Sequence, residues 1–111
     1  MVDHLDDAFG ALSDPTRRQV IELLMEGPQM ASTLAERTDT SRSAMSRHLR
    51  VLRTGGLVQA TTPDADARQR LYELRAERFE AAQAWLDQVH AFWSEQLQSF
   101  SAHIEATRGN Q

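Results

Sequence analysis

The chain has 111 residues, 41% of them hydrophobic and 25% charged, and a net charge of −4, values typical of one folded globular domain and not of a disordered or fibrous chain. It contains no cysteine, which excludes disulfides, thiolate zinc sites, iron–sulfur clusters and cysteine nucleophiles. No apolar run approaches the ~20 residues of a membrane span and the first residues are acidic where a targeting peptide would be basic, so we expect a cytoplasmic protein with no membrane partner.

The first third of the chain predicts three short helices. Apolar residues recur at helical spacing over residues 4–12. Asp14–Pro15 marks the start of a second helix, because Asp is a good N-cap and Pro fits the first helical position. The apolar stripe of this helix ends at Gly27–Pro28. A third helix is predicted over residues 31–37.

The middle of the chain predicts a fourth helix and then a β-hairpin. Ser41 is the expected N-cap of the fourth helix, which ends at Gly55–Gly56. Two short segments rich in β-compatible residues follow, at residues 57–62 and 69–74. The turn-forming residues 63–67 separate them, so a hairpin is expected over this part of the chain.

A long last helix is predicted over residues 76–107. Large apolar side chains recur along it at alternating steps of three and four. They are more numerous than a small domain can cover by itself. We therefore expect the chain to form a symmetric dimer.

Positive charge is concentrated in the middle of the chain. All twelve basic residues are arginine, and seven of them fall between Arg37 and Arg70. The net charge is −5 over residues 1–36, +4 over residues 37–70 and −3 over residues 71–111. A basic segment between acidic flanks favours a polyanionic partner, although arginines on a solvated helix face give the same pattern.

Residues 31–54 have the pattern of a helix-turn-helix. Ala35 is small where the first helix must let the second pack, Asp39 lies in the turn, and Met45 is the apolar anchor of the second helix. The hairpin at residues 57–74 then predicts the winged form of this motif.

This part of the chain resembles the ArsR/SmtB family of bacterial transcriptional repressors. The resemblance is carried by the segment ALSDPTRRQVIELLMEGPQMASTLAERTDTSRSAMSRHLRVLRTGGLV, continues through LVQATT and RQRLYEL, and covers about residues 5–100. The stretch WLDQVHAFWSEQL resembles the branch of the family without evident metal ligands. We expect a mainly α fold with a small β-hairpin: about five helices and a two-stranded wing, in a single domain over residues 1–111.

In that family each subunit of a dimer inserts its recognition helix into the major groove of double-stranded DNA. The resemblance implies that the base-reading residues are Arg42, Ser43, Ser46 and Arg47. The residues expected near phosphates are Ser41, His48 and Arg50, with Arg68 and Arg70 on the wing. These residue types suit the roles, because a guanidinium can hold guanine O6 and N7 and a hydroxyl can bind a base or a phosphate. For His48, a half-buried packing role is an equal alternative.

The family also implies a homodimer that pairs through its first and last helices, at residues 4–12 and 76–107. Two-fold symmetry would then require a nearly palindromic operator. The residues expected in the dimer interface are Leu5, Phe9, Leu12, Val89, Phe92, Trp93 and Phe100.

Two departures from the family pattern concern the turn and the wing. Asp39 stands where the turn often has glycine, but aspartate tolerates the left-handed conformation, so the turn should form. The wing turn at residues 63–67 lacks the usual glycine and carries two carboxylates, Asp64 and Asp66. They oppose phosphate contacts, so deep insertion of the wing is not expected.

Metal sensing and catalysis find little support in the sequence. The family's cysteine ligands in the third helix are missing, because the corresponding segment is MASTLAE. The family's other metal site lies on the last helix and needs an aspartate two residues before a histidine. Here Gln88 precedes His90, and His103 and Glu105 do not reproduce the remaining spacing. No glycine-rich phosphate loop or nucleophile elbow occurs. We expect no metal, no cofactor and no enzymatic activity.

The sequence thus predicts a dimeric repressor that occludes a promoter, with an unknown inducer. One alternative is a winged helix used for protein–protein contact, although such a module would present an apolar or acidic recognition face. Another is a sensor of small molecules with its ligand site at the dimer interface, where Trp85, Phe92, Trp93 and Phe100 could line a cavity.

Overall fold

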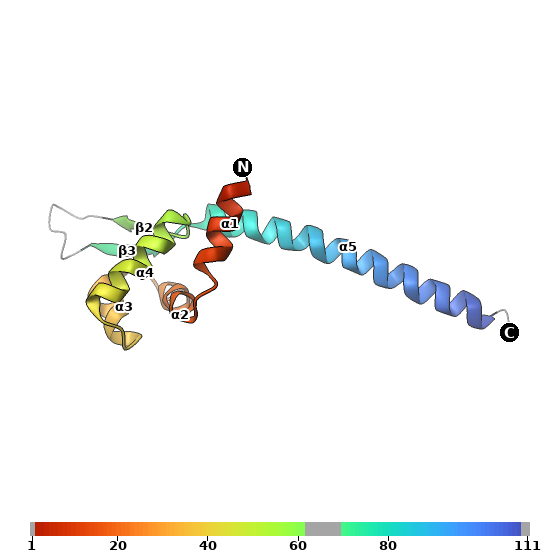
Figure 1. Ribbon diagram of the computed structural model, residues 1–111, viewed down its shortest axis with the longest axis horizontal. Helices are drawn as coiled ribbons and strands as arrows, with labels where there is room; N and C mark the ends of the chain where they lie inside the picture. The colour runs from red at the N-terminus through yellow and green to blue at the C-terminus, as the bar shows by residue number, and fades with distance from the viewer. Residues whose placement is uncertain (1, 62–69, 110–111) are drawn as a thin grey trace.

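The computed structural model describes residues 2–61 and 70–109. In chain order its elements are α1 (Val2–Ala11), α2 (Pro15–Leu24), β1 (Gln29–Met30), α3 (Ala31–Arg37), α4 (Arg42–Thr54), β2 (Val58–Thr61), β3 (Leu71–Leu74) and α5 (Ala76–Gly109). Figure 1 shows that all elements except α5 gather into one body, while α5 leaves this body as a long rod that ends near the C-terminus. The expected mainly α fold with a small β element is confirmed.

The two helix starts predicted from capping residues are confirmed. The side chain of Asp14 accepts a hydrogen bond from the Arg17 amide at 3.1 Å, with Pro15 at the first helical position of α2. The Ser41 hydroxyl accepts a hydrogen bond from the Ala44 amide at 3.1 Å at the start of α4. These local bonds fix where α2 and α4 begin.

The sheet has three antiparallel strands in the order β1-β3-β2. The predicted two-stranded wing is confirmed for β2 and β3, whose register pairs Val58 with Leu74 and Thr61 with Leu71. The third strand, β1, was not predicted. It has only two residues, too few for an alternating pattern, and it forms because β3 offers Tyr72 and Leu71 as partners on its free side.

The core lies between α2, α3, α4 and the sheet. Its largest fully buried side chains are Leu34, Met45, Leu49, Leu52, Leu57, Val20 and Val58. Leu12, which was expected in the dimer interface, is partly buried and packs against this core. The remaining expected interface residues lie on α1 and α5.

Helix α5 is supported by the body only at its beginning. Ala82 is buried there and Phe79 packs against the core, where α5 also contacts α1. A helix of 34 residues is roughly 50 Å long, and the molecule accordingly extends over 75 Å. Large apolar side chains stay exposed along the rest of the rod: Trp85, Leu86, Phe92, Trp93, Leu97, Phe100 and Ile104. In the described part of the chain, no helix combines the length and apolarity that a membrane crossing requires.

Candidate nucleic-acid interface

The turn between α3 and α4 is held by local hydrogen bonds. The Thr38 hydroxyl donates to the Leu34 carbonyl at 2.7 Å, and the Thr40 amide donates to the Ala35 carbonyl at 2.9 Å. Asp39 between them has a φ of 53°, the left-handed conformation expected for this position. The turn therefore forms without glycine.

Two buried residues set the contact between α3 and α4. Ala35 is 5% exposed and Met45 only 1%, as expected for the small residue of the first helix and the anchor of the second. Because α3 and α4 pack through these side chains, the opposite side of α4 is turned to solvent. The helix-turn-helix predicted over residues 31–54 is thus present.

The exposed side of α4 holds most of the residues expected to contact DNA. Its exposed side chains include Ser41 at the cap and Arg42, Ser43, Ser46, Arg47, Arg50 and Arg53 along the helix. Within residues 2–61 and 70–109, the guanidinium groups of these four arginines make no hydrogen bond or ion pair. They are therefore free to bind an external anion.

His48 is the exception on this helix, because it is half-buried. Its Nδ1 lies 3.4 Å from Nη1 of Arg17 and 4.0 Å from Oδ2 of Asp14, both at the start of α2. This placement supports the packing alternative and holds the middle of α4 against α2.

Two arginines of α2 have a role that the sequence did not reveal. Arg17 Nε donates to the Ala11 carbonyl at 2.7 Å, and Arg18 Nη1 donates to the Leu12 carbonyl at 2.8 Å. These carbonyls close the end of α1 and would otherwise lack helical partners. Arg17 and Arg18 thus fix the angle between α1 and α2, a contact for which sequence spacing gives no signal.

The cap residue Asp14 has a lowered pKa. The hydrogen bond from the Arg17 amide is the main cause; burial opposes it, and electrostatic attraction to Arg17 adds to it. The ionised carboxylate therefore stabilises the folded state above the ordinary carboxyl pKa of 3.8, and this stabilisation is lost as the pH falls through the lowered value.

Asp14→Asn should therefore lower stability at neutral pH, because asparagine keeps the cap but loses the charge. The difference from the parent chain should disappear in acid, when the parent's carboxyl is also protonated. Urea unfolding as a function of pH measures this. Glu95→Gln, at an exposed carboxylate of α5, serves as the control. A destabilisation by Asp14→Asn that stays constant from neutral to acid pH would contradict the electrostatic explanation.

The structure places only part of the wing. Arg70 precedes β3 and is half-buried. Arg68 and the turn at residues 63–67, with Asp64 and Asp66, lie outside the described residues. The expectation that the wing inserts only shallowly stays a prediction.

The residues expected in the dimer interface, apart from Leu12, lie on α1 and α5. Leu5 and Phe9 of α1 are half-buried, and Phe9 meets Trp85 of α5 edge to face with ring centroids 5.6 Å apart. Farther along α5, Val89 is half-buried, and Phe92, Trp93 and Phe100 are 56–63% exposed. Over residues 2–61 and 70–109, no three histidine or carboxylate side chains come together as a metal site would require.

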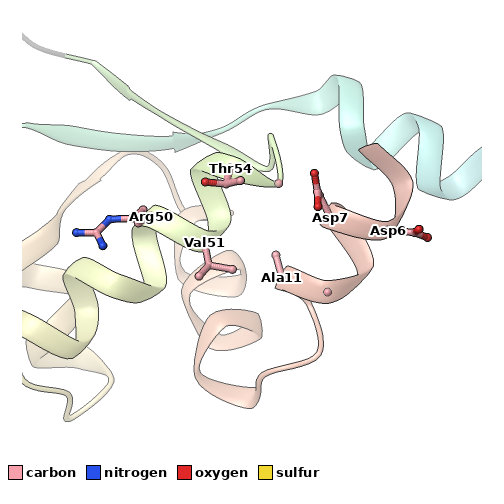
Figure 2. A pocket seen from close by; sticks show the side chains of 8 residues that line it. Asp6, Asp7, Ala11, Arg50, Val51 and Thr54 are labelled. Carbon is pink, nitrogen blue, oxygen red and sulfur yellow. The ribbon is translucent and has the colours of Figure 1, made fainter. Parts of the chain in front are cut away.

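A small pocket separates α1 from the second half of α4. Its volume is about 310 Å³ (Figure 2). Figure 2 shows Val51 and Ala11 lining the gap between the two helices, while the Arg50 side chain points away from α1. At Gly55 the helices approach closely, because a Cβ there would lie 3.0 Å from the Asp7 carbonyl. The pocket thus lies at the junction of α1 and α4, and Arg50 at its edge stays exposed.

The helix-turn-helix, the adjoining hairpin and the arginine face together define a winged helix-turn-helix domain. Residues 12–59 match a family described as a helix-turn-helix domain. The HTH-type transcriptional regulator Rv2034 of Mycobacterium tuberculosis is 36% identical over 101 residues, which cover 91% of this chain and 89% of the relative.

Three further comparisons agree with this class. An ArsR-like transcriptional regulator from Rhodococcus sp. RHA1 has 29% identity and a TM-score of 0.75, covering 89% of this chain and 91% of that one. The transcriptional repressor SdpR of Bacillus subtilis is 35% identical over 54 residues, 49% of this chain and 60% of the relative. The crystal structure of the ArsR family transcriptional regulator RHA00566 has 31% identity and a TM-score of 0.76, covering 85% of this chain and 94% of that one. The chain belongs to the ArsR family of winged helix-turn-helix transcriptional regulators, a family of DNA-binding proteins and not of enzymes.

Proposed function

We propose that the chain acts as a homodimeric repressor that binds a nearly palindromic operator and occludes a promoter. The observation that carries the proposal is the exposed side of α4, where four arginines without partners in the described part of the chain surround two serines. A module for protein contact would present an apolar or acidic face here. The relative SdpR, named a transcriptional repressor, supports repression over activation.

The position along α4 divides its residues into two roles. Recognition helices contact base edges with their N-terminal residues, which here are Arg42, Ser43, Ser46 and Arg47. Ser41 stands at the cap, where the amide dipoles of the helix favour a phosphate, and Arg50 lies one turn beyond the base-reading group. His48 holds α4 in place against α2. Arg70, at the base of the wing, is proposed to contact the phosphate backbone of the DNA.

We propose that each subunit is a single winged domain and that two subunits pair through α1 and α5. The apolar side chains of α5 are the largest group left exposed in the described part of the chain, and those of α1 continue the same surface. A two-fold dimer presents its two α4 helices symmetrically, so the half-sites should be read about one helical turn apart or a multiple of it.

Selection of bound sequences from random DNA tests the proposal. We expect a nearly palindromic sequence, whose affinity falls steeply with salt because phosphate contacts release counterions. Arg108→Ala, at the far end of α5, is a matched control that should leave affinity unchanged. Failure to enrich any sequence, or enrichment of a strongly asymmetric one, would contradict the proposed mode of binding.

A further inference from the structure

The beginning of α5 and the first half of α1 line an open pocket. Its volume of about 550 Å³ lies in the range of sites for small molecules. The pocket is lined by residues of α1 and α5, which are His4, Leu5, Glu77, Arg78, Ala81, Ala84, Trp85 and Gln88. Figure 1 shows α1 lying beside the first turns of α5.

Arg78 brings an uncompensated positive charge to this pocket. Its Nη1 is buried and lacks a hydrogen-bond partner in the part of the chain that the structure describes. The neighbouring carboxylate of Glu77 pairs with Arg75 instead, at 3.5 Å. Glu77 also lines the pocket, but Arg75 engages its carboxylate, so an anionic ligand would supply the partner that Arg78 lacks.

The rest of the pocket is mainly apolar. Trp85 is held on one side by the edge-to-face contact with Phe9 and remains 44% exposed on the other. Leu5 and Ala81 extend the apolar wall, and the Gln88 amide supplies one neutral polar group. The combination suits a ligand with one negative charge and a compact apolar body.

We propose that this pocket binds a small organic carboxylate with an aromatic or branched aliphatic body. The guanidinium of Arg78 binds the carboxylate, while Trp85 and Leu5 contact the body. The inference rests on the proposed function, because it makes the carboxylate the effector of a DNA-binding regulator.

A direct contact links the pocket to the recognition helix. Arg78 lies over Gly56, such that a Cβ at Gly56 would be 2.7 Å from Arg78 Cγ. Gly56 has a φ of 73° and follows the last turn of α4, where its amide donates to the Arg53 carbonyl at 2.9 Å. A ligand that repositions Arg78 therefore acts on the end of α4, and its binding should be coupled to that of DNA.

Calorimetric titration of the full chain with phenylacetate and with isovalerate tests the proposal without DNA. We expect saturable binding of at least one of them, and binding of phenylacetamide at least tenfold weaker than that of phenylacetate, because the amide lacks the charge. Arg78→Gln should weaken carboxylate binding at least tenfold. The control Arg108→Gln, at the far end of α5 and outside the pocket, should bind as the parent does. Absence of saturable binding by either carboxylate at millimolar concentration would overturn the proposal.

A second variant keeps the test decisive if Arg78→Gln does not fold. Ala81→Phe fills the pocket from an exposed position of α5 and should abolish binding while the helix content stays unchanged. Unchanged carboxylate binding in this variant would place the site elsewhere. If the probe bound only a monomeric variant of the chain, the partner subunit would occupy the pocket in the dimer, and the proposal would be wrong.

The two proposals fail in different ways. Saturating carboxylate should change the affinity for the selected operator by about fivefold or more. A chain that binds the carboxylate but no DNA would contradict the proposed function. A chain that binds its operator but no carboxylate would contradict only the present inference.

Discussion

Replacing both Phe92 and Trp93 by glutamine is expected to convert the dimer into a monomer. The two rings are 56% and 59% exposed in the single chain and meet at 5.8 Å between centroids, so they form one protruding apolar surface. Full burial of such a side chain contributes about 1.5–3 kcal/mol, and a symmetric interface buries one copy of each ring from each subunit. Sedimentation should show the parent at about twice 12.5 kDa and the variant at 12.5 kDa.

The control for this experiment lies on the same helix, away from both rings. Glu105→Gln is about 140° around α5 from Phe92 and about 120° from Trp93, and it should leave the dimer intact. Glutamine is a good helix former, so α5 itself should persist in both variants. A double variant that still sediments as a dimer would show that the subunits pair through another surface.

Replacing Arg42 or Arg47 by alanine should cost ~1–3 kcal/mol in affinity for the selected operator and relax the preference at one base pair of each half-site. Both side chains are exposed and make no side-chain bond within the described residues, so the fold should be unaffected. Non-specific binding should fall much less, because it depends on phosphate contacts. Competition binding against selected and random DNA measures the specific and the non-specific affinity.

Arg70→Ala provides the contrast between base reading and phosphate binding. It should weaken binding to selected and random DNA about equally. It should also lower the slope of log affinity against log salt concentration by about one. Arg68→Ala, at the other wing arginine, should behave in the same way. If Arg42→Ala and Arg47→Ala both left the selected sequence and its affinity intact, α4 would not be the recognition helix, and the protein-contact alternative would gain support.

The helices of this fold could be predicted because their signals are local. Asp14 and Ser41 bond to amides three residues ahead, and the residues that stop α2 and α4 are glycines within the same segments. Strand β1 could not be predicted in this way. Its two residues become a strand only because they pair with Leu71 and Tyr72, some forty residues away.

The residues of the candidate site also differ in whether a local sequence signal predicts them. The exposed arginines of α4 follow from helical spacing once Met45 is placed in the core. The contact of His48 with Arg17, the capping of α1 by Arg18, and the pocket around Arg78 depend instead on how separate helices meet. These arrangements are set by tertiary packing, and a pattern within one segment does not contain them.

The exposed cations of α4 are all arginine, and this limits how the cell can modify the proposed DNA-binding surface. A guanidinium stays protonated at every physiological pH, so the charge contributed by Arg42, Arg47, Arg50 and Arg53 does not titrate. Residues 42–54 also contain no lysine amine that acetylation could neutralise. The charge that these four arginines contribute is therefore constant, and a regulator that acts on them has to change their position and not their charge.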